Sequence, residues 1–66
     1  MKFKNMSIEI LIGDNFYSYF EPDEVVIETF KVPFLVAYKG ERRILKMEIT
    51  DFKIEIKNNL LTVEGL

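Results

Sequence analysis

The chain has 66 residues, contains no cysteine or histidine, and carries a formal net charge of −2. This length allows one small domain, which we expect to span residues 1–66, near the lower limit for folding without a disulfide, metal or partner. The absence of cysteine and histidine excludes a disulfide framework, a thiolate metal site, and catalysis by either residue.

The apolar content predicts a folded protein. Hydrophobic residues make up 48% of the chain and aromatic residues 14%, which is too apolar for a disordered segment. The sequence has no apolar run long enough to cross a membrane, and residues 1–6 lead into an alternating pattern instead of a signal-peptide core. We therefore expect a soluble, cytoplasmic protein that does not associate with membranes.

Two-residue alternation of apolar and polar side chains predicts extended strands along almost the whole chain. In chain order, the predicted strands cover residues 7–12, 16–20, 25–30, 34–39, 43–50 and 52–57, and a last strand contains Leu61 and Val63. No stretch of ten residues shows the 3.6-residue period of a helix.

Turn-forming residues separate these strands. Residues 13–15 predict a hairpin turn, Pro22 breaks the pattern among three acids, and Pro33 separates two β-branched and aromatic runs. Gly40 and the pair starting at Asn58 predict two further hairpins. The expected fold is all-β, a small antiparallel barrel or sandwich of about five to seven short strands.

The aromatic strand over residues 16–20 is predicted to present two different faces. Alternation places Phe16 and Phe20 on the side of the core and Tyr17 and Tyr19 on the outer side. A tyrosine hydroxyl can remain in contact with water while the ring packs, so the tyrosines suit the surface.

The chain offers little catalytic chemistry. The densest acidic site is Glu21, Asp23 and Glu24, but no calcium-loop motif or second acidic cluster accompanies it, which favours a solvated turn over a metal site. The three glycines are scattered and form no phosphate-binding loop. We expect no enzymatic activity, no catalytic residue, no metal and no cofactor.

A set of basic side chains in two successive predicted hairpins leaves one alternative open. These residues could bind nucleic-acid phosphates on one outer face, or they could form an ordinary mixed-charge surface, since glutamates are interspersed among them. The set comprises Lys39, Arg42, Arg43, Lys46, Lys53 and Lys57.

The charge distribution separates the aromatic strand from these basic residues. Residues 1–30 contain two lysines and six acids, whereas residues 31–66 contain seven basic residues and five acids. Acids beside the tyrosines would repel a phosphate chain but attract a basic protein surface. The leading hypothesis is a non-enzymatic protein-interaction module, an inhibitor or adaptor, and exposed edge strands could also make a homodimer. The predicted partner-binding residues are Tyr17, Tyr19, Glu21, Asp23 and Glu24.

Overall fold

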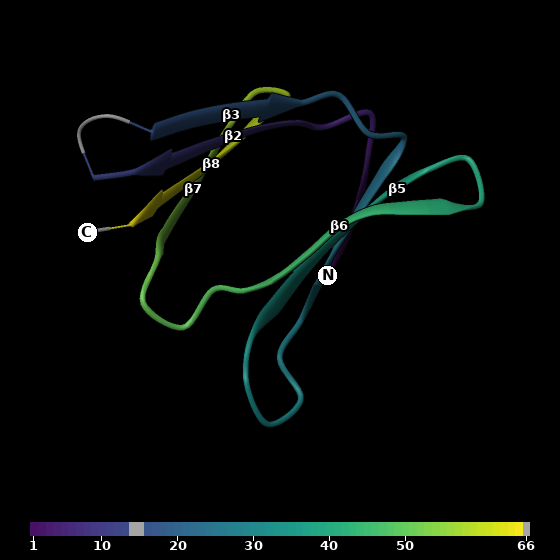
Figure 1. The fold of residues 1–66 in the computed structure, drawn as a ribbon. Coiled ribbons are helices and arrows are strands. Elements are labelled where there is room, and N and C mark those ends of the chain that lie inside the picture. The colour runs from purple at the N-terminus through teal and green to yellow at the C-terminus, as the bar shows by residue number, and fades with distance from the viewer. Residues whose placement is uncertain (14–15, 66) are drawn as a thin grey trace.

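The computed structural model describes residues 1–13 and 16–65, with only the backbone for Phe16 and Tyr17. All of the regular secondary structure in these residues is β-strand. The strands are β1 (Lys2–Lys4), β2 (Ser7–Ile12), β3 (Phe16–Phe20), β4 (Glu24–Glu28), β5 (Phe34–Lys39), β6 (Arg42–Glu48), β7 (Lys53–Lys57) and β8 (Leu60–Gly65). They form two four-stranded sheets, ordered β1-β4-β5-β6 and β3-β2-β8-β7 (Figure 1).

The first sheet is antiparallel throughout. Val25 pairs with Ala37 and Ile27 with Leu35, and all four side chains point into the core because residues at alternate positions share a face. On β6, Leu45 pairs with Ala37 and Arg43 with Tyr38, which leaves Ile44 as an extra residue in a β-bulge.

The second sheet contains a parallel pair at its centre. β2 pairs antiparallel with β3 and parallel with β8, and β8 pairs antiparallel with β7. Ile8 and Ile10 of β2 lie beside Leu61 and Val63 of β8, and these four side chains are buried. β8 therefore lies between β2 and β7, which are distant from each other in the sequence.

One hydrophobic core is shared by the two sheets. Its fully buried side chains come from both of them, and Met6 and Ile49 of the connecting segments join the same cluster. Each fully buried valine, leucine or isoleucine side chain contributes roughly 1.5–3 kcal/mol on burial. No polar or charged residue is buried among those whose side chains the structure describes.

The predicted all-β fold class is confirmed, but the parallel pairing of β2 with β8 departs from the antiparallel arrangement that we expected, and the number of strands and the length of one strand also differ. The described residues form eight strands, because the short segment Lys2–Lys4 pairs with β4 and packs Phe3 against the core. Three residues are too few for alternation to predict a strand. The described residues include no helix that is long and apolar enough to cross a membrane.

The predicted strand over residues 25–30 is too long. β4 ends at Glu28, and Phe30 lies in the connection to β5 with 83% of its surface exposed. The amide of Val32 donates a hydrogen bond of 2.8 Å to the carbonyl of Phe30, around Lys31 with a φ of 69°. This tight turn, which alternation could not reveal, removes Phe30 from the sheet.

Candidate interaction surface

Tyr19 is exposed on the outer face of the second sheet. In the antiparallel register Glu9 pairs with Tyr19 and Ile8 with Phe20, so Tyr19 points outward while Phe20 packs against the core. The tyrosine is 47% exposed, and its hydroxyl donates a hydrogen bond of 3.1 Å to Ser7 Oγ. This bond orients the ring along the outer face of the sheet without burying it.

The ring of Tyr19 borders an open hollow of about 470 Å³. Ser7 and Glu9 of β2 line the hollow together with the turn from Lys57 to Leu60, to which Ser7 is joined by the hydrogen bond of 2.8 Å from its amide to the carbonyl of Asn59. A polar rim around an exposed aromatic ring is the usual composition of a site that contacts another protein.

Two residues of the predicted acidic turn border a hollow that shares one lining residue, Ser7, with the hollow beside Tyr19. Ser7 lines a second, smaller hollow of about 210 Å³ together with Glu21, Asp23 and Lys39. Ser7 thus connects Tyr19 to these acids, and we define Ser7, Tyr19, Glu21 and Asp23 as the Tyr19 surface. Glu21 is exposed, and its carbonyl accepts a hydrogen bond of 3.1 Å from Lys39 Nζ.

Asp23 is held by contacts within the protein. Its Oδ2 accepts a hydrogen bond of 2.7 Å from the amide of Gly40, and its Oδ1 lies 3.6 Å from Lys39 Nζ. The Asp23 amide in turn donates to the carbonyl of Tyr38 at 2.9 Å. Asp23 therefore fixes the connection between β3 and β4, and its carboxylate is only partly available to a partner.

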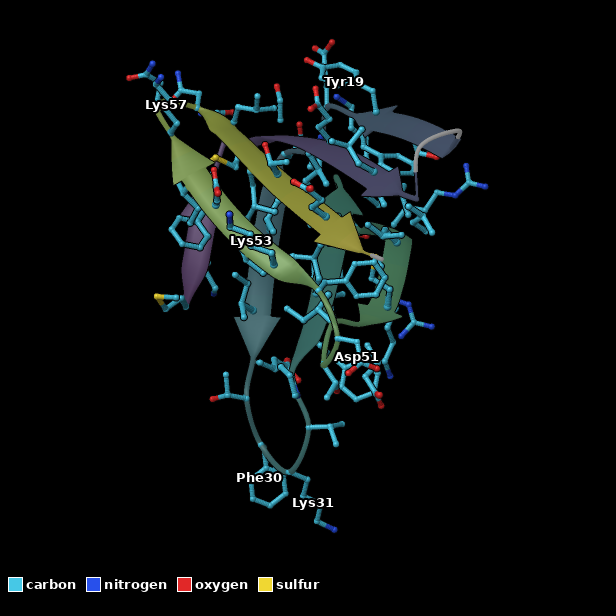
Figure 2. All side chains as sticks on the ribbon, turned by 90° about the vertical axis from the view of Figure 1, so that its left-hand side faces the viewer. Tyr19, Phe30, Lys31, Asp51, Lys53 and Lys57 are labelled. Atoms are coloured by element: carbon cyan, nitrogen blue, oxygen red, sulfur yellow. The ribbon has the colours of Figure 1, made fainter. Side chains whose placement is uncertain are left out.

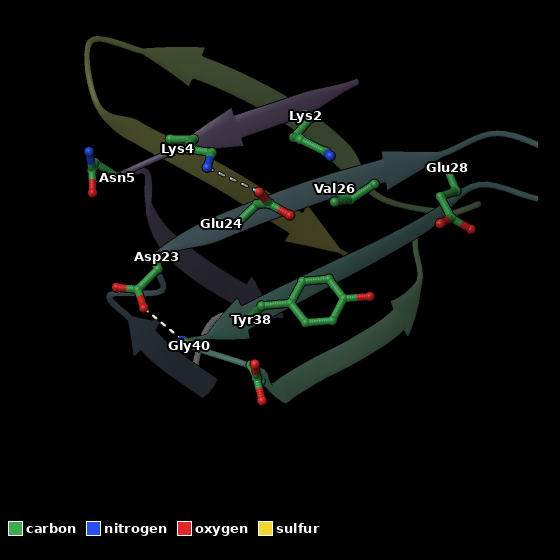
Figure 3. Close-up of a pocket in the computed structure, with 10 residues that line it drawn as sticks. Lys2, Lys4, Asn5, Asp23, Glu24, Val26, Glu28, Tyr38 and Gly40 are labelled. Atoms are coloured by element: carbon green, nitrogen blue, oxygen red, sulfur yellow. Dashed lines mark hydrogen bonds and ion pairs between the residues drawn. The ribbon is translucent and has the colours of Figure 1, made fainter.

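Glu24 lies on a different face from Tyr19. It belongs to β4, on the outer side of the first sheet, where its Oε2 is 3.7 Å from Lys4 Nζ. Tyr38, Val26 and Glu28 share this face and border a shallow depression of about 680 Å³ (Figure 3). Tyr38 was not among the residues predicted to bind a partner, although it alternates with the buried Ala37 and so points outward.

Tyr17 can be placed only by its backbone. It pairs with Leu11 in the β2–β3 register, on the same face as Tyr19 and two residues from it. The predicted role of its side chain, like the inward position of Phe16, lies outside the described residues.

The basic residues are divided between the two sheets. Arg42, Arg43 and Lys46 belong to β6, whereas Lys53 and Lys57 belong to β7, and these strands lie in different sheets. They therefore do not form the continuous stripe that two paired hairpins would produce.

Local contacts already involve several of these cations. Lys39 contacts Asp23, and Lys46 Nζ lies 5.2 Å from the centre of the Phe34 ring. Lys53 Nζ lies 3.0 Å from Glu55 Oε1. The hydrogen bond and charge of Glu55, with the charge of Glu64, raise the pKa of Lys53 above its usual value of 10.5.

In the part of the chain that the structure describes, no three acidic residues gather as a metal site would require. Comparisons of the chain with protein-family models, curated proteins and solved structures found no match.

Proposed function

We propose that this protein is a non-enzymatic protein-interaction module, an inhibitor or adaptor that docks on a larger protein through the Tyr19 surface. The observation that carries the proposal is the position of Tyr19, whose ring is about half exposed while its hydroxyl is held by Ser7. Tyrosine is enriched at protein interfaces because it buries a large area with few torsion angles to restrict.

Pre-orientation of the ring supports this role. A side chain that is already ordered in the free protein loses less conformational entropy on binding. Tyr17, two residues away on the same face of β3, would extend the contact.

The acids define the chemistry of the partner. Glu21 has an exposed side chain beside the hollow that Ser7 also lines, and Asp23 adds charge at the edge. A basic rim on the partner would complement these carboxylates and accelerate association. Glu24 lies on the outer side of the first sheet and would contribute only to a partner that contacts both faces of the molecule.

Affinity capture from the cells that make the protein tests this proposal. Tyr19→Ala should remove the captured partner while leaving the thermal unfolding midpoint nearly unchanged, because the ring is outside the core. Ile56→Ala is the matched control, since Ile56 is 44% exposed on β7, and it should retain the partner. Capture that survives Tyr19→Ala, or extensive unfolding of that variant, would contradict the proposal.

Glu21→Lys tests the charge separately. Reversing this exposed carboxylate should weaken capture and reduce its dependence on salt, because screening acts on exposed charge pairs. A partner captured equally by Glu21→Lys would show that the acids do not contribute.

Binding of a single-stranded oligonucleotide tests the alternative function. Nucleic-acid binding by the basic residues would weaken steeply with salt and would disappear in an Arg43→Glu/Lys46→Glu variant. Because β6 and β7 lie in different sheets, we expect no measurable binding of the unmodified protein even at low salt. The mass of the protein in solution, measured at several concentrations, tests the homodimer.

A further inference from the structure

The connection between β4 and β5 projects an aromatic side chain into solvent. We define the Phe30 tip as Thr29, Phe30, Lys31 and Val32. Phe30 is 83% exposed, more than any other large hydrophobic side chain that the structure describes, and Val32 is also exposed. Figure 2 shows Phe30 and Lys31 at the opposite end of the molecule from Tyr19.

The backbone holds the Phe30 ring away from the core. The hydrogen bond from the Val32 amide to the Phe30 carbonyl spans one residue, Lys31, which has a positive φ of 69°. This is the geometry of a γ-turn with the rarer, strained sign of φ. Among the described residues, the other two non-glycine residues with positive φ are Asn5 and Asn58, and asparagine tolerates this region far better than lysine does.

Backbone hydrogen bonds hold the residues on both sides of the Phe30 tip in place. Glu28 pairs with Phe34 in the β4–β5 register, and the Ile49 amide donates a hydrogen bond of 3.0 Å to the carbonyl of Pro33. The strained turn is thus supported by regular pairing directly below it. Backbone strain that the surrounding structure maintains is concentrated at functional positions in proteins.

Lys31 adds a positive charge beside the exposed ring. Its ammonium lies 5.8 Å from the centre of the Phe30 ring, and it forms no ion pair with any of the described residues. An exposed aromatic ring next to an unpaired cation is complementary to an apolar pocket that has a carboxylate at its rim.

We propose that the Phe30 tip is a second docking element, which inserts the Phe30 ring into an apolar pocket with an acidic rim on a protein partner. The number of cations favours a protein over a membrane. Binding of anionic lipid relies on clusters of several basic residues, whereas Lys31 is the single basic residue of the Phe30 tip. The separation of Tyr19 from Phe30 allows the molecule to contact two surfaces at once.

Photo-crosslinking tests this docking element. Phe30 is replaced by p-benzoylphenylalanine in the full chain, in the cells that make the protein, and Ile56 is replaced in the same way as the control for an exposed apolar position. The expected result is an adduct specific to position 30, mapped by mass spectrometry to apolar residues next to an aspartate or glutamate of another protein. Adding Lys31→Glu should reduce the adduct about tenfold, while the adducts formed at position 56 remain unchanged.

Several outcomes would overturn the proposal. These are an adduct with a second copy of this chain, adducts at position 30 that match those at position 56, and an adduct that persists with Lys31→Glu. Phe30-dependent sedimentation with vesicles of phosphatidylcholine and phosphatidylserine would assign the tip to a membrane instead. Every variant in this experiment retains Tyr19. A negative result at position 30 would therefore contradict the role of the Phe30 tip without contradicting the role of the Tyr19 surface.

Discussion

The amide of Gly40 donates a hydrogen bond of 2.7 Å to the carboxylate of Asp23 (Figure 3). This contact joins the β5–β6 turn to the segment in which the chain passes from the second sheet to the first. Lys39, next to Gly40, adds an ion pair to the same carboxylate. Asp23 therefore stabilises the junction of the two sheets, in addition to any contact it makes with a partner.

Replacing Asp23 should weaken the fold measurably. We expect Asp23→Ala to lower the free energy of unfolding by about 1 kcal/mol, because the hydrogen bond has a charged acceptor but is exposed to solvent. Asp23→Asn keeps an acceptor oxygen and should cost less. Urea unfolding measures both values, with Glu21→Ala as the control, since its exposed carboxylate should change stability by less than about 0.5 kcal/mol. Equal losses for Asp23→Ala and Glu21→Ala would show that the contact with Gly40 contributes nothing.

Gly65 provides the space that the Phe52 ring occupies. A Cβ atom at position 65 would lie 2.5 Å from Cε1 of Phe52, which packs against the core. We expect Gly65→Ala to destabilise the protein by about 1–3 kcal/mol, the usual cost of overpacking. Urea unfolding of Gly65→Ala, Phe52→Leu and the double variant tests the cause, because the smaller leucine should relieve most of the penalty. Additive losses in the double variant would exclude this clash as the cause.

Alternation within a strand predicted the direction of several core side chains, but not the exposure of Ile12 and Ile56 or the burial of Met6. Ile8, Ile10, Leu61 and Val63 all point inward as their spacing indicates, because side-chain direction follows directly from the two-residue repeat. The repeat does not determine which strand lies beside which. The parallel pairing of β2 with β8 joins the two ends of the chain, and nothing in either strand identifies the other as its neighbour.

The same limit explains how the candidate site differs from its prediction. The outward position of Tyr19 follows from alternation within one strand. Between Phe20 and Glu24 the chain changes sheets. The alternation of side-chain directions along β3 therefore does not continue past Pro22, and Glu24 lies on another face. The connection between Glu48 and Lys53 has the same effect on the basic residues, because it places β6 and β7 in different sheets.

The ion pair between Lys53 and Glu55 should be visible in the titration of Lys53. Because Glu55 raises the pKa of Lys53 in the folded state, the charged lysine stabilises the fold. That contribution is complete below the usual lysine pKa and is lost as the pH rises through the folded-state value. Glu55→Gln should lower the pKa of Lys53, as measured by NMR of the lysine side chain. Glu64→Gln should have a smaller effect, since Glu64 acts on Lys53 through charge alone; a larger effect of Glu64→Gln would contradict the ordering of the two causes.

Glycine at position 31 should relieve the strain in the Phe30 tip. A left-handed backbone costs an ordinary L-residue roughly 1–2 kcal/mol, whereas glycine adopts it freely but loses about 0.5–1 kcal/mol through the greater freedom of the unfolded chain. We therefore expect Lys31→Gly to stabilise the protein by about 0.5–1 kcal/mol in urea unfolding, from the difference of these two effects. Thr29→Gly is the matched control, because Thr29 lies in the same exposed tip without a positive φ and should only lose stability. If both variants were destabilised equally, Lys31 would not adopt the left-handed conformation in solution, and the turn would not direct Phe30 outward.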